Sequence, residues 1–209
     1  MRWLAITITM FALAGIPEGR AEEFDHQHST YARVLKEVVR DGKVDYQALK
    51  RHPDGLRRYL DELAAVDERT FNGWVIPQRL AYLINLHNAT VLLMVVERYP
   101  VRSFKRVAGW FGDPYAQPVV RLFGNRITLT ILRDNLMRRH YAEPAIHFGL
   151  VPAARGAPPL RDEPYRPEEL YRQLDDQLRR FLADGHNNKV DLARQRLELS
   201  PLFRTYQAD

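Results

Sequence analysis

The chain has 209 residues, of which 45% are hydrophobic and 27% charged, and its formal net charge is +5. This composition excludes an intrinsically disordered protein, and the length favours one domain with a substantial core. The basic residues form scattered pairs, such as Arg57-Arg58 and Arg138-Arg139, rather than long runs. No RNA-binding motif accompanies them, so nucleic acid is not an expected partner.

The N-terminus has the pattern of a secretory signal peptide. A basic start, Met1-Arg2, precedes an apolar run over residues 4–16, and small residues follow the helix-breaking Pro17. We therefore expect residues 1–21 to be a signal peptide and residues 22–209 to form a single globular domain. A membrane-spanning helix needs roughly 20 apolar residues, so no span is expected after signal removal. An uncleaved N-terminal anchor is the alternative.

Export would place the protein in the periplasm or outside the cell, where cysteines usually form disulfides. The chain contains no cysteine. We therefore expect its fold to depend on core burial alone.

The first half of the chain is predicted to be helical. Apolar residues recur at helical spacing over residues 29–40 and 54–66, and a short helix is expected over residues 46–51. Asp41-Gly42 is a turn signal between them. The longest segment begins at Pro77, ends before Pro100 and is apolar on nearly every face. Such a helix is buried, and we expect it at the centre of the domain.

The second half mixes short helices and strands. Two alternating runs flank Gly124-Asn125 and predict a β-hairpin. The other expected elements are a short helix over residues 103–107, a helix reaching His140, a helix from Pro167 to Ala183, strands over residues 189–192 and 196–199, and a last helix capped by Ser200. The fold class is therefore α+β: a helix-dominated single domain around a buried central helix, with a small antiparallel sheet.

Three polar side chains, Asn85, His87 and Asn88, interrupt the apolar central helix. Burying an unpaired amide costs roughly 1–3 kcal/mol, so these side chains need hydrogen-bond partners. Asn85 and Asn88 are three residues apart and share a helix face. Either they bond the backbone of neighbouring loops or they line a cleft. His147 leaves a similar choice, between a satisfied core residue and a functional group.

The sequence offers few groups for catalysis. It has no cysteine, and its serines are Ser29, Ser103 and Ser200, none of them in a Gly-x-Ser-x-Gly turn. There is no His-Glu-x-x-His motif and no phosphate-binding glycine loop, so neither a metal nor another cofactor is expected. Carboxylates near predicted turns, such as Asp162, could serve as a general base.

Six short motifs occur in an order and spacing that resemble domain-of-unknown-function family 547, which is found in bacterial exported proteins and in plants. The resemblance covers residues 29–206. The motifs are Val44-Asp45-Tyr46, Leu83 to Ala89, Tyr99 to Ser103, Ile146 to Val151, Pro158 to Arg161 with Tyr165, and Leu199 to Phe203.

This chain departs from the family's pattern at two cysteine positions. The family's usual pattern after its His-Phe-Ala-Leu run is Val-Cys-Ala-Ser, with a second Cys before Pro. Here these positions hold Pro152 and Ala157. A cysteine close after a histidine would invite a Cys–His mechanism, which this chain cannot perform.

The family's activity is not established, and the sequence favours a non-catalytic exported domain that keeps the family cleft. It would bind an unknown small ligand or an envelope protein. The candidate cleft residues are Asn85, His87, Asn88, His147, Arg161 and Tyr165. Arg161 could hold a carboxylate or phosphate in bidentate fashion. Two alternatives are a thiol-independent hydrolase, with His147 or a carboxylate as general base, and an interaction domain that uses its basic surface.

Overall fold

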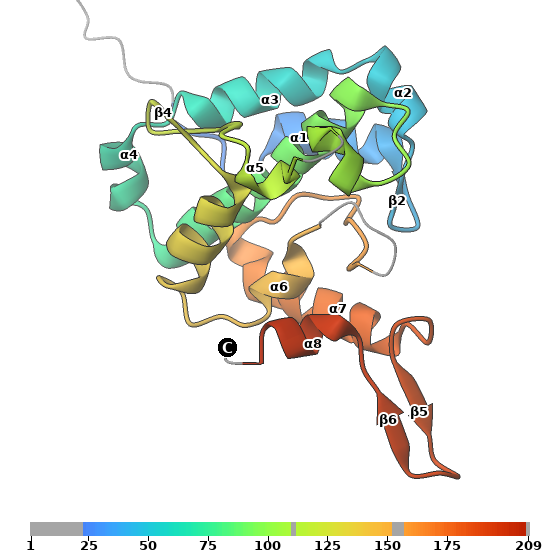
Figure 1. Cartoon of the computed structure of the whole chain (residues 1–209). Helices are drawn as coiled ribbons and strands as arrows, with labels where there is room; N and C mark the ends of the chain where they lie inside the picture. The colour runs from blue at the N-terminus through green and yellow to red at the C-terminus, as the bar shows by residue number, and fades with distance from the viewer. Residues whose placement is uncertain (1–22, 110–111, 152–156, 208–209) are drawn as a thin grey trace, which may run out of the picture.

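A long buried helix, α5 (Ile76–Arg98), runs through the middle of the molecule (Figure 1). The computed structural model describes residues 23–109, 112–151 and 157–207. Between Leu80 and Val96, every side chain of α5 is buried except Leu93. The predicted central helix is therefore confirmed, with Pro77 in its first turn. Its length and hydropathy would also suit a membrane span, but 89% of the apolar window is buried within the fold, as in a core helix.

Four helices precede α5: α1 (Ser29–Val38), α2 (Tyr46–Arg51), α3 (Asp54–Ala64) and α4 (Glu68–Gly73). α1 packs on α3, and α3 in turn packs on α5. Leu35, Leu56 and Leu63 are fully buried at these contacts, because apolar residues at helical spacing turn one face of each helix inward. The sequence did not predict α4, which has only Phe71 buried.

The first predicted helix is two residues too long. Val39–Arg40 instead forms strand β1, which pairs with β2 (Lys43–Val44) around the predicted turn at Asp41-Gly42. The N-cap of α1 is His28, whose side chain makes no capping hydrogen bond. The Asp25 carboxylate accepts from the Ser29 backbone N–H instead, at 2.8 Å.

After α5 the chain forms short elements around a hairpin. Strands β3 (Val120–Leu122) and β4 (Asn125–Ile127) pair across a two-residue turn, Phe123-Gly124, one residue earlier than predicted. Both turn residues have positive φ, which suits the right-handed twist of a two-residue hairpin. Around the hairpin lie η1 (Phe104–Ala108), η2 (Pro114–Ala116) and η3 (Ile131–Arg138), a π-helix.

The C-terminal part begins with α6 (Ile146–Gly149), which packs on the longer α7 (Leu170–Ala183) that follows η4 (Pro167–Glu169). The chain then forms a hairpin of β5 (Lys189–Asp191) and β6 (Arg196–Glu198), which projects from the body (Figure 1). It ends in α8 (Pro201–Thr205), where Ser200 is the N-cap, as expected.

The α+β fold class is confirmed, with helices dominant. In the described residues the predicted small antiparallel sheet is three separate two-stranded sheets. The predicted signal peptide and the first cysteine position of the family, Pro152, lie outside the described residues.

The β1–β2 turn packs closely against the rest of the fold at Gly42. Its φ is +72°, and a Cβ added there would lie 2.4 Å from the Cβ of Pro159. Gly124 has a similar φ of +74°, but no atom lies within 4 Å of an added Cβ. We expect Gly124→Ala to lower the unfolding free energy by roughly 1 kcal/mol, through backbone strain alone. Gly42→Ala should lower the unfolding free energy by roughly 1–3 kcal/mol more than Gly124→Ala does, because the new methyl group also clashes with Pro159.

Urea denaturation of both variants measures the difference. Equal losses would mean that the segment around Pro159 moves aside without cost.

Candidate functional site

The two asparagines of α5 hold loop backbone in place. The amide of Asn85 donates to the carbonyl of Tyr165 at 2.8 Å and accepts from the Tyr165 N–H at 3.0 Å. Asn88 donates to the carbonyl of Gly149 at 2.9 Å and accepts from the Val151 N–H at 3.0 Å. Both side chains are buried. Their hydrogen-bonding capacity is therefore largely used to satisfy buried backbone groups, the first of the two roles left open by the sequence.

Arg161 is also occupied. Its guanidinium donates to Glu163 at 2.6 Å and to Asp176 at 2.5 Å, and the side chain is buried. Two carboxylates already neutralise its charge, which leaves it poorly placed to bind an anionic ligand. Tyr165, the next candidate, is buried, and burial raises its pKa above the ordinary value.

His87 and His147 line one small cavity, although they lie sixty residues apart in the chain. The cavity has a volume of about 60 Å³. Its other lining residues come from four segments of the chain and are Tyr115, Arg133, Leu150, Leu202 and Tyr206. Of the six residues predicted for a cleft, the structure thus brings the two histidines together, with Asn88 beside them.

Hydrogen bonding determines the tautomer of His87. Its Nδ1 lies 3.2 Å from Oδ1 of Asn88. The backbone partners of Asn88 identify that atom as the amide oxygen, which can only accept. Nδ1 must therefore carry the proton when the ring is neutral, and Nε2 is then an acceptor. In the described part of the chain, no hydrogen bond to Nε2 of His87 is found.

His87 is neutral at physiological pH. Burial lowers its pKa from 6.5 to about 4, the hydrogen bond with Asn88 opposes this, and the charge of Arg133 lowers it further. A neutral imidazole with one protonated and one bare nitrogen can recognise a ligand by hydrogen bonding.

Ion pairing and aromatic contacts build the cavity wall. Arg133 donates to both carboxylate oxygens of Asp134, at 2.9 and 2.8 Å, and these bonds hold the pKa of that carboxyl below its usual range. The Arg133 guanidinium also lies over the ring of Tyr115. The ring of Tyr206 stacks on the ring of His147, with 3.6 Å between the ring centroids. The guanidinium carbon of Arg138 lies over the ring of Tyr206, 5.1 Å from its centroid.

Sequence reasoning missed Tyr115, Arg133 and Tyr206. They belong to three different segments and lie in no recognisable motif, so no sequence signal connects them. Among the residues that the structure describes, no group of three or more His, Asp or Glu side chains could hold a metal ion.

The backbone role of Asn85 can be tested without disturbing the cavity, because Asn85 does not line it. Asn85→Ala should lower the unfolding free energy by roughly 2–4 kcal/mol, since it leaves the buried N–H and carbonyl of Tyr165 unsatisfied. Asn72→Ala is the matched control, because Asn72 is exposed on α4. Urea denaturation at neutral pH measures both. A loss in Asn85→Ala no larger than in the control would contradict the role.

Stability should fall as the pH falls through the range of His87. Its pKa is about 4 in the folded protein and near 6.5 in the unfolded chain, so below pH 6.5 the unfolded chain binds more protons. The contribution of the neutral His87 ring to the unfolding free energy is full above pH 6.5 and is lost as the pH falls towards 4. By linkage, roughly 2 kcal/mol is lost between pH 7.5 and pH 5.

Urea denaturation at these two pH values, with the wild type and His87→Gln, isolates this contribution. The variant should lose less stability on acidification than the wild type does. An identical pH dependence would mean that the folded protein protonates His87 freely.

The comparisons with known proteins agree with the motifs. The model of a family described as "Protein of unknown function, DUF547" matches residues 71–182, more than half of the chain. Neither the curated proteins nor the solved structures give a match. The matched segment includes α5 and the two histidines of the cavity. The chain therefore belongs to the DUF547 family, whose activity is uncharacterised.

Proposed function

We propose that this chain is a non-catalytic ligand-binding domain of the cell envelope, and that it binds a small polar molecule between His87 and His147. One observation carries the proposal: two imidazoles from distant segments line the same small cavity. Its volume of about 60 Å³ has room for roughly two waters, or for a ligand of a few heavy atoms.

The chemistry of the wall indicates the kind of ligand. The neutral ring of His87 offers a bare Nε2, which requires a donor from the ligand. Tyr115 and Arg133 carry donor groups, and both line the cavity. A ligand with both a donor and an acceptor, such as a primary amide, satisfies both requirements.

The position of the possible nucleophiles supports binding rather than catalysis. The chain has no cysteine. Ser200 caps α8, Ser29 begins α1, and Ser103 precedes η1. None of these serines is among the described residues that line the cavity. His87, with a pKa of about 4, is a weak general base at neutral pH.

The location in the envelope rests on the sequence of the N-terminus. The basic start, the apolar run over residues 4–16 and the small residues that follow support export. A protein without disulfides can remain folded in the periplasm or in the medium if its hydrophobic core is stable enough.

Histidine NMR can test binding at the cavity. In a chain with ¹⁵N-labelled histidine, acetamide should shift the ring signals of His87 and His147 and leave that of the exposed His186 unchanged. His147→Phe keeps an aromatic ring against Tyr206 but removes the ring nitrogens, so it should weaken the effect on His87. Acetate should cause smaller shifts than acetamide, because it brings no donor to Nε2.

His186→Phe is the matched control and should leave acetamide binding unchanged. Equal shifts at all histidines, or none at the two cavity histidines, would overturn the proposal. Hydrolysis of amide or ester substrates by the wild type but not by His147→Phe would favour the hydrolase instead.

A further inference from the structure

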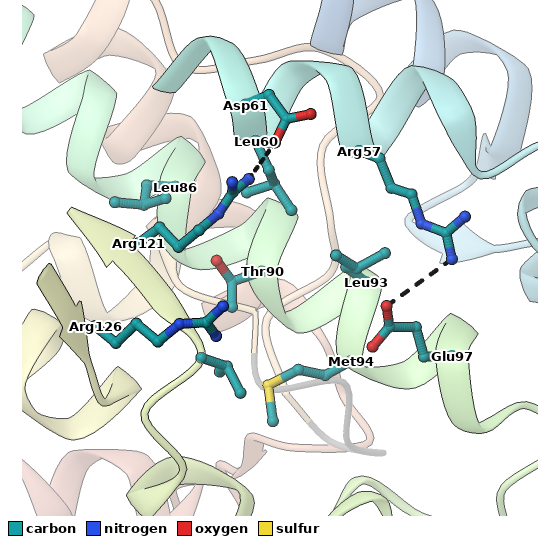
Figure 2. A pocket seen from close by; sticks show the side chains of 11 residues that line it. Arg57, Leu60, Asp61, Leu86, Thr90, Leu93, Met94, Glu97, Arg121 and Arg126 are labelled. Atoms are coloured by element: carbon teal, nitrogen blue, oxygen red, sulfur yellow. Dashed lines mark hydrogen bonds and ion pairs between the residues drawn. The ribbon is translucent and has the colours of Figure 1, made fainter. Parts of the chain in front are cut away.

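A second and larger cavity lies on another side of α5, between that helix, α3 and the β3–β4 hairpin (Figure 2). Its volume is about 350 Å³, which is within the usual range for small-molecule sites of roughly 300–1,000 Å³. It shares no lining residue with the histidine cavity among the described residues. The proposed function does not involve it.

The floor of this cavity is one face of α5. Leu86, Thr90, Leu93 and Met94 line it, and their spacing of four, three and one residues places them along one side of a helix. Leu93 is the residue that is not fully buried between Leu80 and Val96. The protein therefore leaves part of its most apolar helix uncovered at this point.

The rim carries more positive than negative charge. Arg57, Arg121 and Arg126 face two acids, Asp61 and Glu97. Arg121 forms an ion pair with Asp61, and Arg57 lies 3.9 Å from Glu97. Arg126 has no ion pair within the described part of the chain. One positive charge therefore remains without a counter-charge at the rim.

The hairpin places two of these arginines side by side. Arg121 and Arg126 are direct cross-strand partners. Like charges at such positions destabilise a hairpin, so an anion between them would be stabilising. Figure 2 shows the guanidinium of Arg126 beside Thr90, with Leu93 and Met94 further along α5. A positive end and an apolar end thus occur in one cavity.

We propose that this cavity binds a monoanion with a short aliphatic tail, of the kind represented by a medium-chain carboxylate. The head group lies between Arg121 and Arg126, where it supplies the missing negative charge. The tail lies along α5 against Leu93 and Met94. Leu86 and Met94 are eight residues apart, about 12 Å along the helix, which limits the site to a short tail.

Methionine NMR can follow this site separately from the histidine cavity. Met94 lines the cavity, whereas Met137 is buried elsewhere. In the full chain with ¹³C-methyl methionine, octanoate should shift the Met94 signal to saturation and leave Met137 unchanged. Met94→Leu assigns the signal by removing it. Acetate, without a tail, and octanamide, without a charge, should each need at least about tenfold higher concentration.

Arg126→Gln should raise the half-saturating octanoate concentration about tenfold, because it removes a charge-assisted contact. Arg196→Gln is the matched control, since Arg196 is an exposed arginine on another two-stranded hairpin. Leu93→Glu should also weaken binding, by repelling the head group and removing apolar surface. The absence of any octanoate effect on Met94, or equal affinity in Arg126→Gln and Arg196→Gln, would overturn the proposal. Failure of the acetamide experiment would leave this result unaffected.

Discussion

The buried amides of α5 are the constraint on which much of this structure depends. Asn85 and Asn88 lie buried on one face of an apolar helix, where an unpaired amide would be costly. Each pairs with one loop segment by donating to a carbonyl and accepting from an N–H. This is the pairing that a neighbouring β-strand would provide. The loop at Tyr165 and the segment from the end of α6 to Val151 therefore pack in the core without belonging to a sheet.

The same constraint couples the fold to the histidine cavity. Oδ1 of Asn88 accepts from the Val151 N–H and also lies within reach of Nδ1 of His87. One oxygen thus positions the loop that follows His147 and sets the tautomer of His87. A change in the backbone there would alter the hydrogen bonding of the His87 ring, so the stability of the fold and the hydrogen-bonding groups of the histidine cavity are not independent.

The sequence predicted what depends on local pattern. Helical periodicity located α1, α3 and α5, and Ser200 was correctly identified as a helix cap. Both predictions succeed because helix periodicity and helix capping depend on residues that are close together in the sequence. Arg161 shows the limit: a cleft role was plausible from sequence, yet Glu163 and Asp176 neutralise it in the fold. Glu163 is near in sequence, but Asp176 meets Arg161 only because α7 packs beside that segment. Tyr206 likewise reaches His147 only through tertiary packing.

Both cavities join the family core to segments outside the matched region, residues 71–182. The core supplies His87, Arg133 and His147 to one cavity, and α8 and the residue after it supply Leu202 and Tyr206. In the larger cavity, the family core supplies the α5 floor and the two hairpin arginines, and α3 supplies Arg57 and Asp61. The segments outside the family core, α3 and α8, thus complete the walls of the two cavities, and both cavities include residues of α5. Under the two binding proposals, relatives that keep α5 but differ in these outer segments would bind different ligands, because the outer segments set the charge of each cavity and the access to it.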